Sequence, residues 1–335
     1  MNFIREDDIQ ALRSLLNHSR RAAISTHTHP DGDALGSSTA LALYLQEQEG
    51  KEVTVLLPDA PADNLRFILS PKVRYVIGPE GIPDFDLLFL LDSNGFSRTE
   101  GLASALRASS ADKVLIDHHL SPEREAFGTV FSTPEISSAS ELLYWVLKAL
   151  DWREEDNPAA AEALLTGMTT DTNNFANSVF PSTFRMASQL IAAGADRDAI
   201  LQKLYGSSRE NRIRLIGYMQ YENLTVLPEG AAYMILARET ARRFQMEEGE
   251  SEGLVNIPLG IGSVRLSVLL REDEGHFRVS VRSKKGVSAR DLAQRYFHGG
   301  GHENAAGGKL FIGSDIPSPE AAPAYLETVL KTFLS

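Results

Sequence analysis

The first half of the chain alternates short apolar runs with segments of helical periodicity. Residues 34–48 and 99–107 have the spacing of helices. Four apolar runs of strand length surround them, at 22–25, 52–57, 86–91 and 113–116. Because strands that alternate with helices favour parallel pairing, the pattern predicts an α/β domain whose mostly parallel sheet is flanked by helices.

The pattern changes twice after these strands. From 138 to about 217, apolar residues recur at helical spacings, and Pro158 and Pro181 stand near two helix starts. Beyond 217 the chain predicts strands within 222–237 and 263–282, a polar loop at 247–253, a glycine-rich segment at 299–308 and a helix near 318–333. We therefore expect a catalytic domain at 1–190, a helical linker at 191–220 and a smaller mixed-sheet domain at 221–335.

The composition is ordinary for a globular protein, with 43% hydrophobic and 23% charged residues in a length of 335, which favours two domains. No apolar run reaches the roughly 18 residues of a membrane span, and no signal peptide is visible. The absence of cysteine excludes a disulfide scaffold, a thiolate zinc site and a cysteine nucleophile. We expect a cytoplasmic protein without a membrane partner.

The net charge of -12 comes from the first part of the chain. Residues 1–200 contain 16 lysines and arginines against 29 acidic residues, whereas 201–335 contain 17 against 16. Long nucleic acids bind to a basic track, so this balance argues against them as partners. The acidic excess fits either plain surface solubility or carboxylates that hold metal ions, and charge alone does not separate the two.

Ionisable residues gather where the predicted elements end. They follow three strands and one helix: His27, Asp31 and Asp33; Asp92; Asp117, His118 and His119; and Asp171. Taken singly, each aspartate is more often a helix cap or a turn residue than a ligand. Parallel strands, however, bring their carboxyl ends to one edge of a sheet, where ligands bind in open α/β folds.

Several carboxylates at one edge favour a metal site. They would raise each other's pKa unless cations neutralised them. Carboxylates and imidazoles without thiolates suit Mn²⁺, Mg²⁺, Fe²⁺ or Co²⁺ better than structural zinc. The candidate ligands exceed the need of one ion, and two ions about 3.5–4 Å apart that share a carboxylate are typical of phosphate-ester hydrolysis.

The four clusters resemble, in the same order, the motifs of the DHH phosphoesterase superfamily, which is named after the sequence Asp117-His118-His119. The resemblance implies ligands for two Mn²⁺ ions (alternatively Mg²⁺ or Co²⁺): His27 and Asp31 for one, Asp33, His118 and Asp171 for the other, and Asp92 as the bridge. Asp92 and His118 are thereby catalytic candidates. Asp117 would support the site, and His119 would face the substrate phosphate or donate a proton to the leaving oxygen, unless its role is only a supporting hydrogen bond.

The second domain resembles the DHHA1 domain through the glycine-rich segment 299–308 and the upstream Arg282-Ser283. Glycines let backbone amides approach a phosphate, and an arginine can grip one with two donors. The candidate substrate-binding residues are Arg98 and His119 in the first domain and Arg282, Ser283, Gly300, Gly301 and His302 in the second. The competing readings are a flexible glycine-rich turn and a surface ion pair for Arg98.

Length and layout most resemble the bifunctional oligoribonuclease/pAp phosphatase branch of the family (NrnA-type). That branch implies hydrolysis of oligoribonucleotides of about two to five nucleotides to 5′-mononucleotides, and of pAp to AMP and phosphate, by a homodimer. Phosphodiesterases of cyclic or linear dinucleotides (c-di-AMP, pApA) are a second reading. A nucleotide sensor without catalysis is a third, although the full ligand set argues against it.

Overall fold

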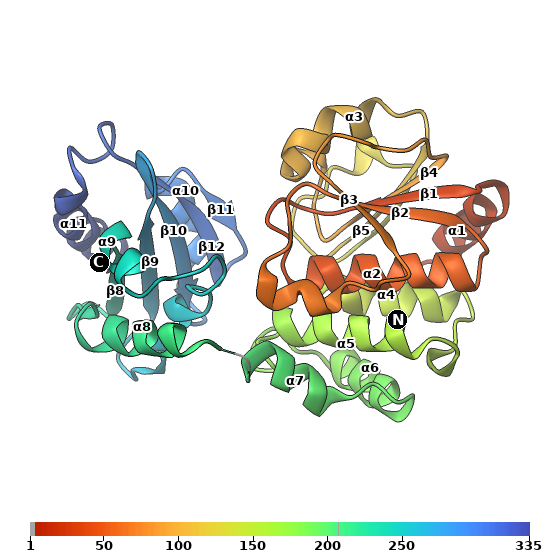
Figure 1. The fold of residues 1–335 in the computed structure, drawn as a ribbon. Coiled ribbons are helices and arrows are strands. Elements are labelled where there is room, and N and C mark those ends of the chain that lie inside the picture. The colour runs from red at the N-terminus through yellow and green to blue at the C-terminus, as the bar shows by residue number, and fades with distance from the viewer. Residues whose placement is uncertain (1–3, 207) are drawn as a thin grey trace. The chain divides into compact units, whose positions relative to one another are not determined.

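The computed structural model describes residues 4–206 and 208–335, which form two compact units divided at that point (Figure 1). The division falls inside the segment expected as a linker. Its helices pack into the units themselves: α7 (Arg197–Tyr205) contributes Ile200 to the core of the first unit. The helix α8 (Glu210–Tyr221) contributes Leu215 and Met219 to a core of the second.

The first unit is built on a six-stranded sheet in which every pairing is parallel, in the order β3-β2-β1-β4-β5-β6. Its strands are β1 (Arg21–Ser25), β2 (Glu52–Leu57), β3 (Arg74–Ile77), β4 (Leu87–Leu91), β5 (Asp112–Asp117) and β6 (Thr129–Ser132). Its remaining helices are α1 (Glu6–His18), α2 (Gly32–Glu47), α3 (Ala103–Ala108), α4 (Ala139–Ala149), α5 (Pro158–Asp171) and α6 (Pro181–Ala192). The predicted α/β fold with a parallel sheet is confirmed.

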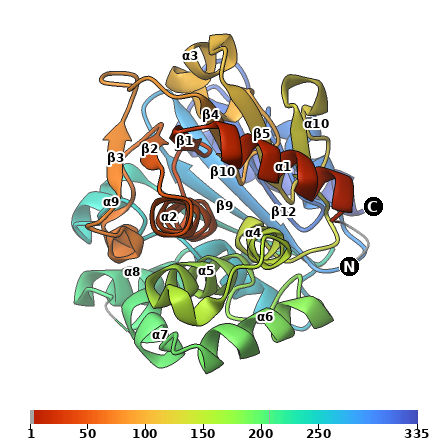
Figure 2. The same cartoon turned by 90° about the vertical axis from the view of Figure 1, so that its right-hand side faces the viewer.

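The apolar strands are continuous because the sheet is buried on both faces. Along β4 every residue is buried, and successive side chains enter opposite cores: Phe89 faces α1, α2 and α4, whereas Leu88 and Leu90 face α3. Figures 1 and 2 show α2, α4 and α5 together on one side of this sheet. The alternating strands and helices of this unit therefore form layers, with helices packed against the sheet.

The strand order reverses direction between β1 and β4. In doubly wound sheets the crevice beyond the carboxyl ends of the strands lies at such a switch point, and ligands bind there. The residues that follow β1 and β4 meet at this place. Both segments carry ionisable side chains.

Two glycines let α2 and α5 approach closely. A Cβ atom on Gly36 would lie 2.5 Å from the Ala163 carbonyl oxygen and 2.9 Å from the Gly167 Cα. A Cβ on Gly167 would in turn lie 2.1 Å from Ser140 Oγ and 3.1 Å from Asp33 Oδ1. The contact therefore requires glycine at both positions, and it brings the start of α2 beside the end of α5.

The second unit has a six-stranded sheet in the order β11-β12-β10-β9-β8-β7. Its strands β8 and β9 pair in parallel and the other described pairs are antiparallel, so the predicted mixed character of the sheet is confirmed. Its strands are β7 (Thr225–Val226), β8 (Ala231–Leu236), β9 (Leu266–Glu272), β10 (His276–Ser283), β11 (Gly300–Gly301) and β12 (Ala305–Phe311). The helices α10 (Ala289–Tyr296) and α11 (Ala322–Leu334) pack with one apolar cluster, and α8 and α9 (Arg238–Arg243) with another.

The prediction did not include α1 or β12, and two predicted helical segments are interrupted. The helix expected at 99–107 is a 3-10 helix, Phe96–Leu102, followed by α3, because Glu100 has a φ of 36°. The helical span after 138 is broken between α5 and α6, where Asn173, Asn174 and Phe175 all have positive φ. No helix in the described parts of the chain is both long enough and apolar enough to cross a membrane.

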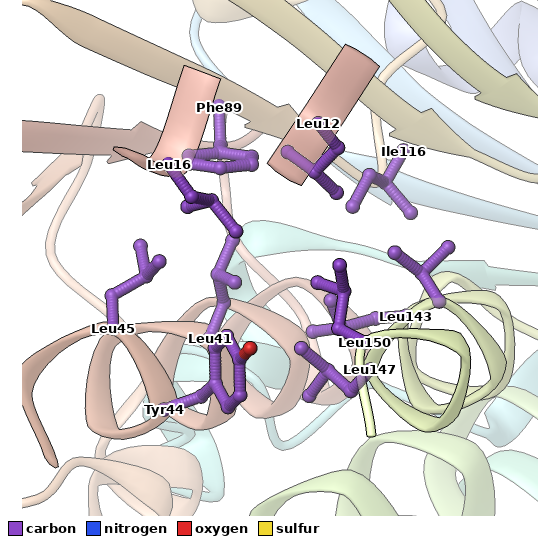
Figure 3. A pocket seen from close by; sticks show the side chains of 11 residues that line it. Leu12, Leu16, Leu41, Tyr44, Leu45, Phe89, Ile116, Leu143, Leu147 and Leu150 are labelled. Carbon is purple, nitrogen blue, oxygen red and sulfur yellow. The ribbon is translucent and has the colours of Figure 1, made fainter. Parts of the chain in front are cut away.

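A small void lies between the sheet and the helices of the first unit. It measures about 10 Å³ and is lined by apolar side chains from α1, α2, α4, β4 and β5, among them Leu143 and Phe89 (Figure 3). A space this small and apolar does not hold ordered water. Leu143 is fully buried, so its side chain has packing partners that a truncation would lose.

We predict that Leu143→Ala lowers the free energy of unfolding of the first unit by about 2–5 kcal/mol, because it removes buried methyl groups and enlarges an existing void. Urea unfolding followed by circular dichroism measures the change. Ile77→Ala is the control, since that side chain is 52% exposed on β3; it should cost less than about 1 kcal/mol. An equal loss in both variants would contradict the packing described.

Candidate metal centre

His27 is held in a fixed orientation just beyond β1. Its Nδ1 lies 2.7 Å from the Thr28 carbonyl oxygen, so Nδ1 carries a proton and donates it there. The other ring nitrogen, Nε2, lies 3.8 Å from Asp31 Oδ1 and 3.3 Å from Asp92 Oδ2. A backbone carbonyl that fixes one imidazole nitrogen and frees the other for a cation is typical of metal-binding histidines.

Asp92 lies between two imidazoles at the end of β4. It is 2% exposed, and its Oδ1 lies 3.3 Å from His118 Nε2 while its Oδ2 faces His27. Among the described residues no hydrogen bond reaches Oδ1. Asp92 also has a φ of 51°, a strained conformation for aspartate. A buried carboxylate with an unsatisfied oxygen is a site that a cation would complete.

Asp33 is held by the amino end of α4. The Ala139 N–H donates to its Oδ2 at 2.6 Å, and the Ser140 N–H donates to its Oδ1 at 2.9 Å. The positive end of the helix dipole stabilises this buried carboxylate. The neighbouring Asp31 accepts from the Asp33 and Ala34 N–H groups, so Asp31 is the cap of α2 as well as a candidate ligand.

The site residues fall into three sets whose ligand atoms lie within 4.8 Å of one another. The sets are His27, Asp31 and Asp92; Asp33, His118 and Asp171; and Asp92, Asp117 and His119. His118 Nε2 lies 3.7 Å from Asp171 Oδ2 and joins the second set to Asp92. These buried histidines and aspartates fit a metal site, since they are oxygen and nitrogen donors gathered around one carboxylate.

The pKa values show how strongly the carboxylates demand positive charge. Although burial opposes it, contact with Asp92 and the charge of Asp31 raise the pKa of His27 to about 9. Burial is similarly outweighed at His118, whose pKa rises to about 10 beside Asp171 and Asp92. Without metal, both imidazoles are therefore protonated at neutral pH.

The carboxylates of the site fall into two groups, because the pKa is raised at Asp33 and Asp171 and lowered at Asp92. Burial raises the pKa of Asp171 to about 7 and that of Asp33 well above its usual range, where repulsion from Asp92 adds to it. Close contact with the imidazoles of His118 and His27, together with the positive charge of His27, holds the pKa of Asp92 well below its usual range in spite of burial. Asp92 is thus the centre of negative charge in the site.

Asp117, His119 and Arg98 form a connected chain beside this charge. His119 Nδ1 lies 2.7 Å from the fully buried Asp117, and Arg98 Nη1 lies 2.9 Å from His119 Nε2. Because arginine only donates, Nε2 accepts and the proton is on Nδ1, pointing at Asp117. In this arrangement Nε2 has no proton for a leaving group, which argues against the proton-donor role. Contact with the substrate phosphate and a supporting hydrogen bond both stay predictions for His119.

In the second unit the glycine-rich segment is an ordered hairpin rather than a flexible turn. Gly300 pairs with Gly307 and Gly301 with Ala306. A Cβ on Gly299 would lie 1.9 Å from the Gly307 carbonyl oxygen, so this glycine serves backbone packing. A Cβ on Gly300, by contrast, would have no described atom within 4 Å. Packing thus explains why residue 299 is glycine, but it does not explain the glycine at residue 300.

The other candidates of this unit lie around the same hairpin. Arg282 is the penultimate residue of β10 and is paired with Ala305. Ser283 is buried, donates to the Val287 carbonyl oxygen and accepts from Asn304 Nδ2, so its hydroxyl is engaged within the protein. His302 is at the hairpin tip, where its N–H donates to the Ala305 carbonyl oxygen. Asn304 ties the hairpin to the end of β10.

Three groups that hold the candidate residues in place have no clear signal in the sequence. The N–H groups of Ala139 and Ser140 hold Asp33, and Asn304 secures the hairpin. The pattern Ser138-x-x-Glu141 marks the start of a helix, and Ser138 does cap α4. Nothing in that pattern says which distant carboxylate the helix meets.

A parallel α/β unit with histidines and aspartates gathered at its switch point fits a metal site of the kind that phosphoester hydrolases use. The DHH family N-terminal domain matches residues 21–168, and the DHHA1 domain matches residues 231–333. The chain belongs to the DHH/DHHA1 phosphoesterase family, and it is a hydrolase of that family.

Individual relatives support this membership. The bifunctional oligoribonuclease and PAP phosphatase NrnA of Thermus thermophilus is 31% identical, covering 86% of this chain and 83% of its own. The cyclic-di-AMP phosphodiesterase GdpP of Geobacillus thermodenitrificans is 28% identical over 95% of this chain, which spans 48% of that relative. The crystal structure of an exopolyphosphatase-related protein from Bacteroides fragilis superposes with a TM-score of 0.91, at 33% identity, over 99% of this chain and 97% of that one.

We predict that Mn²⁺ binding to the chelator-treated protein releases protons at neutral pH. His27 and His118 are then below their pKa values of about 9 and 10, and only neutral imidazole binds a metal. The apparent affinity should therefore rise with pH towards that range. Calorimetric titration in two buffers of different ionisation enthalpy measures the release, expected at about two or more protons per chain, because the raised pKa values of Asp33 and Asp171 add to those of the two histidines.

The variants His27→Ala and His18→Ala separate the site from the surface. His18 is on α1 and bonds only its own helix among the contacts described, so its loss should leave proton release unchanged. Loss of His27 should reduce it. Metal binding without net proton release in the unaltered protein would contradict the charge states given above.

Proposed function

We propose that this protein hydrolyses oligoribonucleotides of about two to five nucleotides to 5′-mononucleotides, and pAp to AMP and phosphate. Two Mn²⁺ ions per chain, or Mg²⁺ or Co²⁺ in their place, would assist the reaction. The observation that carries the proposal is Asp92, which is buried between His27 and His118 with one oxygen towards each. A carboxylate in this position suits a bridge between two metal ions.

The chain's residues would divide the work around that bridge. His27 and Asp31 would hold one ion, and Asp33, His118 and Asp171 the other, as their grouping supports. Bound divalent ions lower the pKa of water and neutralise phosphate oxygens, which is the chemistry that phosphoester hydrolysis needs. Arg98 and His119 would orient the phosphate so that the ester P–O bond breaks as water supplies its oxygen.

The second unit would bind the rest of the substrate. Arg282 at the end of β10 and the hairpin residues Gly300, Gly301 and His302 are our candidates for its phosphates. The engaged hydroxyl of Ser283 supports a smaller role for that residue, as an acceptor.

A second candidate activity is hydrolysis of a cyclic or linear dinucleotide such as c-di-AMP or pApA. The relative named as a cyclic-di-AMP phosphodiesterase aligns with 95% of this chain at 28% identity, which is close to the figure for the NrnA relative. The NrnA relative is aligned over 83% of its own length and the phosphodiesterase over 48%.

We predict Mn²⁺-dependent release of phosphate from pAp and of mononucleotides from a 5′-phosphorylated RNA dinucleotide, abolished by chelator. Asp92→Ala should lower kcat by at least about 10³-fold, because it removes the carboxylate that contacts His27 of one proposed ligand set and His118 of the other. Chromatographic product analysis with pAp, the RNA dinucleotide and c-di-AMP as parallel substrates measures these outcomes.

Asp84→Ala is the matched control, since Asp84 precedes the same strand and its side chain is 92% exposed. That variant should retain full activity. Turnover of c-di-AMP alone would favour the second candidate. No turnover of any substrate, in protein shown to contain metal, would refute the proposal and favour the nucleotide-sensor reading.

We predict that Gly300→Ala raises KM for the RNA dinucleotide by about 10-fold while folding is unaffected. The added methyl group meets no described atom of the protein, so it would obstruct only a ligand that approaches the backbone there. Gly308→Ala is the contrast, because its Cβ would lie 2.2 Å from the Phe297 carbonyl oxygen and should destabilise the unit. Unchanged kinetics in Gly300→Ala would remove this residue from the proposed binding surface.

A further inference from the structure

Glu123 connects the two loops that carry the proposed phosphate-facing residues. The post-β4 loop (92–98) ends in Arg98, and the post-β5 loop (118–128) begins with His118 and His119. The Glu123 N–H donates to the Asn94 carbonyl oxygen at 2.7 Å, and the Phe96 N–H donates to Glu123 Oε2 at 3.2 Å. One residue thus holds the backbone of the other loop at two points.

Arg107 on α3 fixes the Glu123 carboxylate. Its two terminal nitrogens donate to the two carboxylate oxygens at 2.5 and 3.0 Å, a forked pair. The guanidinium also lies over the Phe96 ring, at 5.3 Å, and Phe96 stacks on Phe127 at 4.9 Å. The Arg107 charge holds the pKa of Glu123 below its usual range, so the pair is ionised at neutral pH.

The local sequence is shaped for this contact. A Cβ on Gly95 would lie 2.7 Å from Glu123 Oε2 and 2.9 Å from its Cβ, so only glycine lets the two loops approach this closely. The Asn94 side chain adds a bond from Nδ2 to the Leu120 carbonyl oxygen at 3.2 Å. The contact is therefore built from several independent elements of both loops.

The far end of the post-β4 loop reaches the site. The Thr28 N–H, next to His27, donates to the Arg98 carbonyl oxygen at 2.8 Å, and the Arg98 guanidinium donates to His119. Loosening the loop at Asn94 and Phe96 would therefore displace Arg98 from His119. Geometry errors of about 1 Å at such a group cost up to about 100-fold in rate.

We propose that the Glu123–Arg107 pair is a positioning device that holds Arg98 against His119 for the phosphate of the substrate. The assignment of Arg98 and His119 to the substrate rests on the proposed function. The loop contact itself does not, and it can be measured without turnover. Both side chains of the pair are partly exposed, so its contribution to global stability is small.

Glu123→Gln tests the device, because it keeps the size of the side chain and removes the charge that Arg107 grips. Hydrogen exchange measured by NMR should become at least about 10-fold faster at the Phe96 and Thr28 amides, while exchange within β1 and β4 stays the same. Tm should fall by no more than about 4 °C. Glu125→Gln is the matched control, since Glu125 is an exposed residue of the same loop. Unchanged exchange at both amides would overturn the loop contact, whatever the enzyme's substrate.

A double-mutant cycle on the RNA dinucleotide tests the link to Arg98. Glu123→Gln alone should lower kcat/KM by about 10- to 100-fold. Added to Arg98→Ala, it should change kcat/KM by less than about 2-fold, because the group that it positions is already gone. Equal losses in both backgrounds would show a merely structural effect and overturn the positioning role. Activity in the parent protein verifies the proposed function separately.

Discussion

Buried negative charge is the constraint on which the first unit depends. Asp33 and Asp92 are 1% and 2% exposed, and burying a carboxylate is costly unless charge and hydrogen bonds compensate. The protein compensates Asp33 with the amino end of α4 and Asp92 with the imidazoles of His27 and His118. The compensation is incomplete, since one oxygen of Asp92 receives no hydrogen bond from the described residues. A bound cation would satisfy this remaining demand, and the cost of folding the site would then be linked to the ability to bind metal.

The parallel sheet supplies the frame that makes such a cluster feasible. Carboxyl ends of parallel strands converge on one edge, and the strand order changes direction between β1 and β4, the place where ligands bind in such sheets. Glycines at 36 and 167 let α2 and α5 meet closely, and this brings ligand atoms of Asp33, His118 and Asp171 within 4.8 Å of one another. The loops beyond β4 and β5 then need their own connection. Glu123 provides it from outside the cluster of charges, where a partly exposed ion pair costs little to form.

Glycine has two distinct uses in this chain. At Gly36, Gly95 and Gly299 a side chain would collide with backbone or with a neighbouring residue, so these positions serve close packing. At Gly300 a Cβ atom would meet no described atom within 4 Å, so packing does not explain the glycine. A ligand that approaches the backbone there would explain it. The glycine-rich segment therefore contains glycines that are needed to pack the hairpin and one glycine whose backbone is left accessible. Composition alone does not tell which glycine has which role.

Local patterns determined much of this protein. Apolar strands followed by or ending in Asp92 and Asp117 predicted the parallel sheet and the candidate ligands. A run of consecutive apolar residues indicates a buried strand, and the residue at its end marks the carboxyl end of that strand. The edge strands β3 and β6 escaped prediction, since each has four residues and is only partly buried. Only the tertiary structure decided the strand order, the meeting of Asp33 with Ala139 and the link from Glu123 to Phe96. Those contacts join residues from distant segments, and their energies arise from packing and charge that no single segment contains.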